Sequence, residues 1–342
     1  MATYRTLALI TAILVGCNGD GVHGSAEPIE ATAADTGASG PHWTPLSTDG
    51  LVGTWGSFPA GRHHVGGIAG LSMGMGTTDL RTYQVQDDTL VASVRGVADV
   101  PRYCGCAFED VTRDELVIVG GRNDGFSEEP TAERVAADGL ATSLEHDGAA
   151  DHPVGCAAFY AASVDRGYVF GGARGGALSD QLWRYDPGAG SFTALDVPGP
   201  SARYDAGLVQ LSDGRVYLVG GRTDDGMASD VWRFDPATET WTELPPSTEA
   251  PAGRRFPFLV GDTHGLYYGY GTSSPTGQRM LKDMWHFDLT SQVWEKLSFE
   301  GDVPANRGFA VSLQGPEGSL GVLAFGFDGD REVYEDAWAF WP

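Results

Sequence analysis

The sequence of 342 residues carries 46 acidic and 22 basic side chains, which gives a formal net charge of −24. This charge excludes a general nucleic-acid binder, because phosphate recognition needs a basic surface, and it opposes docking on anionic lipid. The 49 glycines and the aromatic content of 11% instead favour many short strands joined by tight turns.

The first 16 residues have the pattern of an export signal. Arg5 supplies a positive charge, and residues 6–16 form an apolar run that is too short to span a bilayer. The run ends in Leu14-Val15-Gly16-Cys17, which resembles the lipobox of bacterial lipoproteins. In that family the cysteine receives diacylglycerol and the peptide is cut before it, so Cys17 is the predicted lipidation site. The alternative is an ordinary signal peptide in which Cys17 is incidental.

Residues 17–41 are predicted to be a lipidated cysteine followed by a flexible linker. The segment is rich in Gly, Ala, Ser, Asp and Glu, and it has too little apolar content to bury a core. Asn18 follows the cysteine in place of the Asp that favours inner-membrane retention in Gram-negative families. The resemblance therefore implies an outer-membrane lipoprotein, on the periplasmic or cell-surface face, that contacts the membrane only through its lipid.

Residues 42–342 repeat a pattern about every 50 residues. The clearest copies have a strand that ends in glycine, then a loop, an Asp and a Trp. The glycine-ended segments are 168–172, 217–221, 267–271 and 322–326, and the tryptophans are Trp183, Trp232, Trp285 and Trp338. A second aromatic follows the first three tryptophans at Phe192, Trp241 and Trp294. A period of this length indicates a propeller or a solenoid.

The copy at 206–244 shows the repeating unit most clearly. Residues 206–211 and 215–219 flank Asp213-Gly214, and Asp-Gly between apolar runs predicts a β-hairpin. Residues 230–236 predict a third strand, and residues 241–244 a fourth, outer strand. Trp232 and Trp241 are expected to pack between neighbouring units rather than to bind a ligand. Four antiparallel strands of this kind make one propeller blade.

This pattern resembles the kelch repeat, in which a diglycine ends the second strand and an aromatic pair lies on the third and fourth. The six reference glycines are Gly76, Gly121, Gly172, Gly221, Gly271 and Gly326. The resemblance implies an all-β, six-bladed propeller over residues 42–342. Trp338 has no fourth-strand aromatic after it, whereas a matching segment surrounds Trp43, so an N-terminal strand is expected to close the ring in the last blade. The alternative, an open solenoid, should carry polar capping repeats.

Arginines recur at two places in the repeat. One set follows a proline near the start of the innermost strand: Arg62, Arg102, Arg203, Arg254 and Arg307. The third copy has Pro153, with Val154 where this arginine would fall. A second set, Arg122, Arg174 and Arg222, comes just after the diglycines.

In some kelch proteins arginines at these two places grip acidic peptides, because two guanidinium N–H groups match two carboxylate oxygens. The resemblance thus implies a ligand-binding ring at the channel mouth. The alternative is that each arginine pairs with an Asp of a neighbouring blade or with loop carbonyls.

Cysteines and histidines gather near the starts of three consecutive inner strands. They are Cys104 and Cys106 in copy two, Cys156 in copy three, and His63 and His64 in copy one. His63, His64 and Cys104 could hold zinc or copper. Export into an oxidising compartment instead favours a disulfide between adjacent blades, with Cys106–Cys156 as the expected pair and one thiol left over.

The sequence thus predicts a monomeric, exported binding module with no cofactor. Its expected partner is a protein, or an acidic small molecule or sugar, at the channel mouth. The alternative is a carbohydrate-active enzyme, either a sugar mutarotase or a metal-dependent oxidoreductase of the galactose oxidase/kelch type. No catalytic residue is assigned, because the sequence has no recognised hydrolase, zinc-protease or phosphate-loop motif.

Overall fold

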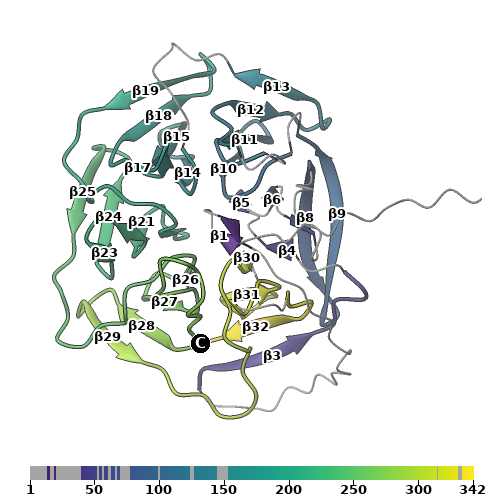
Figure 1. The fold of residues 1–342 in the computed structure, drawn as a ribbon, viewed down its shortest axis with the longest axis vertical. Helices are drawn as coiled ribbons and strands as arrows, with labels where there is room; N and C mark the ends of the chain where they lie inside the picture. Colours follow the sequence, from purple (N-terminus) through teal and green to yellow (C-terminus); the bar gives the residue numbers. More distant parts are fainter. Residues whose placement is uncertain are drawn as a thin grey trace, which may run out of the picture.

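Six antiparallel sheets of four strands stand around a central axis in the computed structural model of the chain (Figure 1). The structure describes residues 40–51, 78–98, 101–123, 127–144, 153–313, 315–329 and 333–342, with short strands at 14–15, 19–20, 54–55, 58–60, 63–65 and 68–69. Each sheet is one blade, so the predicted six-bladed propeller is confirmed.

Blades three, four and five have their first strand innermost and their fourth strand outermost (Figure 1). Their strands are β14 (Ala157–Ala161), β15 (Arg166–Phe170), β18 (Leu182–Asp186) and β19 (Ser191–Leu195); β20 (Gly207–Gln210), β21 (Val216–Val219), β24 (Val231–Asp235) and β25 (Thr240–Glu243); and β26 (Phe258–Gly261), β27 (Gly265–Gly269), β28 (Met284–Asp288) and β29 (Val293–Lys296). These three blades contain the copies in which the complete aromatic pair was predicted.

Blade four shows why the sequence folds in this way. The hairpin between β20 and β21 turns at Asp213-Gly214, where Gly214 has a φ of 86° and the Asp213 carboxylate accepts a hydrogen bond from the Arg215 N–H at 3.0 Å. Glycine adopts this left-handed conformation without a steric penalty. All four residues of β21 are buried, because this strand lies between two others and both of its faces meet neighbouring blades.

Blades one and two form from the copies that match the repeat least well. Their strands are β5 (Phe58–Ala60), β6 (His63–Val65), β8 (Asp79–Gln86) and β9 (Thr89–Val97) in blade one, and β10 (Cys106–Asp110), β11 (Glu115–Val119), β12 (Ala132–Val135) and β13 (Ala141–Leu144) in blade two. Blade two keeps its register although both repeat tryptophans are missing. The predicted reference glycine of copy one, Gly76, lies outside the described residues.

Blade six contains strands from both ends of the repeat region. It consists of β30 (Val311–Leu313), β31 (Gly321–Ala324), β32 (Ala337–Trp341) and, as its outer strand, β3 (His42–Leu46). β3 pairs antiparallel with β32 (Figure 1), and Trp43 lies opposite Phe340 in the register of this pair. The prediction that an N-terminal strand around Trp43 closes the ring is therefore confirmed.

Trp43 also joins blade six to blade five. Its indole is buried, and its ring lies 5.4 Å from that of Phe258, 5.6 Å from Tyr270 and 4.9 Å from Phe340, measured between centroids. Tilted and edge-on aromatic contacts at such distances add to the stabilisation from buried apolar area. Closure thus rests on side-chain packing as well as on strand pairing.

The fourth-strand aromatics pack each blade against the one before it. Trp241 of blade four lies opposite Phe234 in the same sheet and contacts Phe170 of blade three, with ring centroids 5.3 Å apart. Trp232 is half-buried against the same cluster of residues from both blades. The expectation that Trp232 and Trp241 pack between neighbouring blades is confirmed.

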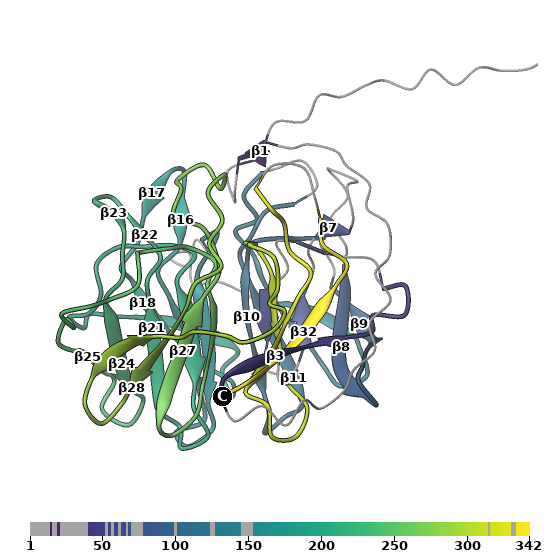
Figure 2. The ribbon, with the colours of Figure 1, turned by 90° about the horizontal axis from the view of Figure 1, so that it is seen from below.

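Short hairpins project from one face of the ring, which we call the loop face (Figure 2). Blade three contributes β16 (Ala173–Arg174) with β17 (Ala177–Leu178), and blade four contributes β22 (Arg222–Thr223) with β23 (Gly226–Met227). Two more two-residue pairs are β4 (Thr54–Trp55) with β7 (Ile68–Ala69), and β1 (Leu14–Val15) with β2 (Gly19–Asp20).

The blades are also connected by backbone hydrogen bonds near the start of each innermost strand. The N–H of Gly155 donates to the carbonyl of Cys104, that of Asp205 to Gly155, and that of Phe256 to Asp205, at 2.7–3.0 Å. Each of these four residues has a positive φ between 51° and 68°. We call this row the inner rim, and it places successive blades in a fixed relationship beside the loop face.

Candidate functional site

Arg254 shows what the proline-associated arginines do. Its guanidinium is fully buried, and it donates to both carboxylate oxygens of Asp283 at 2.8 and 2.9 Å and to the carbonyl of Tyr270 at 3.1 Å. Asp283 also accepts the indole N–H of Trp285 at 2.7 Å. Although burial acts to raise it, the hydrogen bonds and charge of Arg254 hold the pKa of Asp283 below its ordinary value.

The same three-residue network recurs in blades four, five and six. Its members are Arg203–Asp230–Trp232, Arg254–Asp283–Trp285 and Arg307–Asp336–Trp338. In each case the arginine also donates to the carbonyl of the residue that directly follows the second strand of its own blade. The network therefore connects the inner and third strands within one blade.

Two blades depart from this network. In blade two, Arg102 pairs with Glu133 and donates to the carbonyls of Gly120 and Thr131 at 3.0 and 3.1 Å. In blade three, Val154 bridges Ala173 as Tyr204 bridges Arg222 in blade four, so Pro153 occupies the arginine position. This corrects the expectation from the sequence repeat, in which Val154 takes the arginine position.

These contacts decide the role of the first arginine set. Arg102, Arg203, Arg254 and Arg307 are 0–2% exposed, and each pairs with an acid of its own blade rather than with a neighbouring blade. Their guanidinium groups are therefore part of the blades and do not line the channel mouth as a ligand-binding ring. Arg62, the fifth predicted member, lies outside the described residues.

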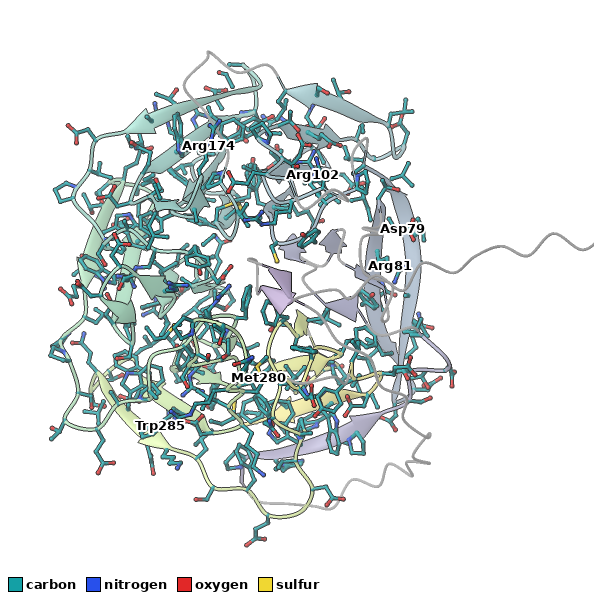
Figure 3. All side chains as sticks on the ribbon, in the orientation of Figure 1. Asp79, Arg81, Arg102, Arg174, Met280 and Trp285 are labelled. Atoms are coloured by element: carbon teal, nitrogen blue, oxygen red, sulfur yellow. A yellow bond between two sulfur atoms is a disulfide. The ribbon has the colours of Figure 1, made fainter. Side chains whose placement is uncertain are left out.

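The second arginine set contributes Arg122 and Arg222 to the loop face. Each follows a diglycine and bridges the residue after the first-set arginine, Tyr103 in blade two and Tyr204 in blade four. The second glycine is required, because a Cβ on Gly221 would lie 3.0 Å from the carbonyl oxygen of Tyr204. Arg174, labelled in Figure 3, is one position further along its loop and is exposed in β16.

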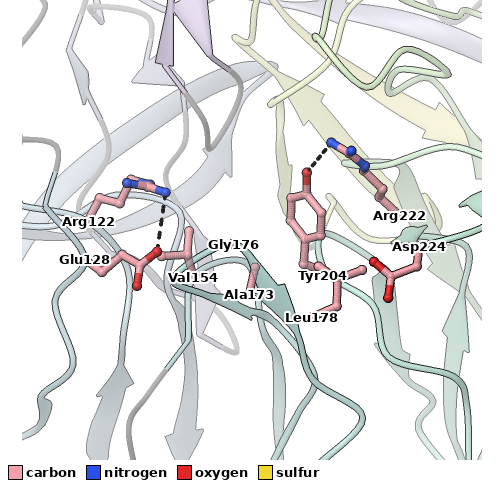
Figure 4. Close-up of a pocket in the computed structure, with 9 residues that line it drawn as sticks. All are labelled: Arg122, Glu128, Val154, Ala173, Gly176, Leu178, Tyr204, Arg222 and Asp224. Atoms are coloured by element: carbon pink, nitrogen blue, oxygen red, sulfur yellow. Dashed lines mark hydrogen bonds and ion pairs between the residues drawn. The ribbon is translucent and has the colours of Figure 1, made fainter.

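A pocket of about 100 Å³ opens on the loop face between blades two and four (Figure 4). It is lined by Arg122, Glu128, Val154, Ala173, Gly176, Leu178, Tyr204, Arg222 and Asp224. Blade three supplies the small and apolar floor, and the two flanking blades supply the charges. The guanidinium groups of Arg122 and Arg222 face each other across the pocket (Figure 4).

The contacts of the pocket arginines differ from those of the buried arginines. Arg122 lies 3.7 Å from the Glu128 carboxylate, and Arg222 donates to the hydroxyl oxygen of Tyr204 at 3.0 Å. Glu128 also accepts the N–H of Gly175, at 2.9 Å, which ties the rim of blade two to the hairpin of blade three. The contact of Arg222 is a single hydrogen bond to a hydroxyl, unlike the bidentate carboxylate contacts of the blade networks.

A buried ion pair beneath the pocket was missed by the sequence analysis. Asp205 of blade four pairs with Arg255 of blade five, at 2.6 Å, and both side chains are at least 94% buried. The signal that could have found it is the repeat itself, since Arg255 stands where blades two and four have Tyr103 and Tyr204. A buried residue that differs in type from the equivalent residues of the other repeats is a candidate for a functional role.

The cysteines form disulfides. Cys106 and Cys156 are bonded to each other across blades two and three, which is the pair expected from the sequence. Cys104 is also disulfide-bonded, so it is not the leftover thiol that the sequence analysis expected, and it offers no thiolate to a metal. Cys17, the predicted lipidation site, lies outside the described residues.

His63 and His64 occupy a different strand from the one expected. They lie in β6, the second strand of blade one, opposite Thr82 and Arg81 of β8, whereas the innermost strand is β5. Among the residues that the structure describes, no three His, Cys, Asp or Glu side chains are close enough to form a metal site. Nor does the described part of the chain contain a helix that could cross a membrane.

The similarity of this chain to known proteins agrees with its architecture. Residues 111–315, more than half of the chain, match the family profile of the KLHDC2/KLHL20/DRC7 Kelch-repeats domain. The search of curated proteins gave no match. The matched region begins just after the first strand of blade two, covers blades three to five and enters blade six, and it includes every residue that lines the pocket. The chain therefore belongs to the family of the KLHDC2/KLHL20/DRC7 Kelch-repeats domain.

Proposed function

We propose that this kelch-repeat propeller binds a carboxylate-bearing ligand in the pocket between blades two and four. Kelch propellers are generally binding modules, and a fold of this kind does not itself specify a ligand. The observation that carries the proposal is the position of Arg122 and Arg222, which face each other from two blades across a small pocket. The ligand is either an acidic peptide of a partner protein or an acidic sugar.

The chemistry of the pocket favours an anion for a physical reason. A guanidinium presents planar pairs of N–H donors that fit carboxylate oxygens, and Arg122 and Arg222 are only half-buried. Arg203, Arg254 and Arg307 already have bidentate carboxylate partners, whereas Arg222 donates a hydrogen bond to a hydroxyl and Arg122 lies 3.7 Å from the Glu128 carboxylate. An anion can therefore gain hydrogen bonds here without first breaking a buried ion pair.

The pocket also has charges that limit what can enter it. Glu128 and Asp224 lie beside the two arginines, and the whole chain is strongly acidic. A ligand with many negative charges would be repelled by this surface, whereas one carboxylate can fit between two guanidinium groups. A ligand that carries a single carboxylate next to neutral or hydroxyl groups suits the pocket better than a polyanion.

Calorimetric titration of two probes tests the proposal. Glucuronate represents an acidic sugar, and a short peptide with one Asp among Gly and Ser represents an acidic protein segment. We expect one of them to bind, and the double variant Arg122→Gln/Arg222→Gln to weaken binding at least tenfold, since a hydrogen bond to a charged group contributes about 1.5–3 kcal/mol. Which probe binds distinguishes a sugar from a peptide ligand.

The matched control is Arg174→Gln, which removes an exposed arginine of the loop face that does not line the pocket. This control must bind as the unaltered protein does. Equal losses in the control and the double variant would show only a general effect of surface charge, and the pocket would then not be the binding site. Binding of neither probe would also overturn the proposal.

We further propose that the propeller works outside the cytoplasm, held to the outer membrane by a lipid on Cys17. The support is the sequence Leu14-Val15-Gly16-Cys17 and the polar linker that follows it. A linker of this composition would let the folded head sample a range of distances from the membrane surface. Labelling of cells with radioactive palmitate tests it, because Cys17→Ala must abolish incorporation.

A further inference from the structure

Asp205 lies directly beneath the pocket, in the inner rim of blade four. It follows Tyr204, which lines the pocket, and its side chain is 6% exposed. Its N–H donates at 2.8 Å to the carbonyl of Gly155, and Gly155 follows the pocket residue Val154. Asp205 is therefore one residue away in sequence from Tyr204, and it contacts the neighbour in sequence of Val154, so it adjoins two residues that line the pocket.

A carboxylate at this position is not part of the repeat. In blades two, three, five and six the equivalent left-handed positions are occupied by Cys104, Gly155, Phe256 and Phe309. Blades therefore form without an acid here, and burying a charge costs free energy unless it is paired. The fold does not explain why Asp205 is present.

Arg255 contacts only one of the two carboxylate oxygens of Asp205. Its Oδ2 accepts the Nε–H of Arg255 at 2.9 Å, and Arg255 also contacts the faces of the Tyr204 and Phe256 rings, both 4.7 Å from its guanidinium carbon. The other oxygen, Oδ1, has no hydrogen-bond partner among the described residues. It lies against Gly155, where a Cβ atom would come within 2.3 Å of it.

Three arginines act on Asp205, and two of them line the pocket. Arg255 faces it from blade five, Arg222 from its own blade and Arg122 from blade two. Burial raises the pKa of Asp205 to about 6, although these three arginines act to lower it. Glu128 and Asp224 are the acids that face the two pocket arginines, and no histidine is among the described lining residues.

We propose that Asp205 couples anion binding in the pocket to the uptake of a proton. When Asp205 is ionised, its negative charge offsets part of the positive charge of Arg122 and Arg222, so the pocket attracts an anion less strongly. When Oδ1 carries a proton, this offset disappears. A bound anion in turn favours the protonated form, because linkage between two sites is reciprocal. This inference rests on the proposed anion-binding function of the pocket.

Titration of the full chain with glucuronate and with the single-Asp peptide tests the coupling. We expect the Kd to rise about tenfold between about pH 5 and about pH 8. This is the change that follows if a bound anion raises the pKa of Asp205 by about one unit. In two buffers of different ionisation enthalpy near pH 6, binding should take up a fraction of one proton. This second measurement needs no variant.

The Asp205→Asn variant should bind with a Kd that no longer depends on pH and that matches the low-pH value of the unaltered protein. Asp213→Asn is the matched control, since Asp213 pairs with Arg215 at the opposite end of the same blade, and it must keep the full pH dependence. A pH-independent Kd without proton uptake in the unaltered protein would refute the coupling alone. No binding at any pH would refute the pocket proposal as well.

Discussion

Asp230 binds both terminal nitrogens of Arg203, at 2.6 and 2.7 Å, inside a single blade. The same carboxylate accepts the indole N–H of Trp232, so one Asp connects the inner strand to the repeat tryptophan of the third strand. This relationship explains why an Asp precedes each of these tryptophans by two residues. The Asp, the Trp and the distant Arg are parts of one network that the repeat preserves.

Arg254→Ala should lower the free energy of unfolding by about 3 kcal/mol, because it leaves the Asp283 carboxylate and the Tyr270 carbonyl without their buried partner. Denaturation with urea measures this change. Lys282→Ala is the control, since Lys282 is exposed beside Asp283 and its loss should alter stability by less than about 0.5 kcal/mol. Unchanged stability in the arginine variant would mean that these arginines are not structural.

The same networks predict how stability depends on acid. The pKa values of Asp230, Asp283 and Asp336 are held below the ordinary value by their arginines, against the effect of burial. A carboxyl group with a lowered pKa in the folded state contributes stability above its unfolded pKa of about 3.9, and this contribution is lost as the pH falls further. Urea midpoints measured from about pH 5 downwards should therefore fall steeply.

Asp283→Asn should flatten this acid dependence, whereas replacement of the exposed Asp302 should not. If the urea midpoint falls equally with pH in both variants and in the unaltered protein, the network carboxylates do not cause the acid dependence of stability. The stability that Asp205 contributes depends on pH in the opposite direction, because the pKa of Asp205 is raised to about 6. Stability from this group decreases as the pH rises through about 4 to 6, and Asp205→Asn should remove that decrease.

The repeat pattern was sufficient to predict the ring, the number of blades and the closing strand. Glycine spacing, the Asp213-Gly214 turn and the aromatic pairs act locally, so a single sequence reveals them. Whether an arginine is buried inside a blade or lines the pocket depends on tertiary contacts. Arg254 and Arg222 look alike in sequence, but one is enclosed with Asp283 and the other reaches a pocket.

The irregular parts of the repeat were the hardest to predict. Pro153 replaces an arginine and shifts the apparent alignment by one residue, which only the strand bridge from Val154 to Ala173 resolves. His63 and His64 were placed on the innermost strand, but the hairpin of β5 and β6 puts them on the second. Asp205 and Arg255 come from different blades, so no local pattern predicts their pairing.

The disulfide between blades two and three should contribute strongly to stability. Cys106 and Cys156 are separated by 50 residues, and a closed loop of this length restricts the unfolded chain by about 4 kcal/mol in the loop-entropy treatment. We therefore expect Cys106→Ser/Cys156→Ser to lower the free energy of unfolding by that order. Urea denaturation with and without reductant measures it, and the double variant must be insensitive to the reductant at this site.

Trp43→Ala should weaken ring closure. The variant removes a buried indole that contacts Phe258, Tyr270 and Phe340, and a change of this kind costs about 3–5 kcal/mol. Thr44→Ala in the same strand is the control, because its side chain is only half-buried. Hydrogen exchange should show the loss first in β3 and β32, and a uniform loss over all six blades would argue against local opening at the closure.

The state of Cys104 reports on the predicted lipid anchor. The sequence has four cysteines, and Cys106 and Cys156 use two of them. A disulfide of Cys104 within the same chain and a lipid on Cys17 are therefore mutually exclusive. If Cys17 is lipidated in the exported protein, the mass of the mature chain should show a diacylglyceryl group. A mature chain without this added mass would mean that the export sequence does not lead to lipidation.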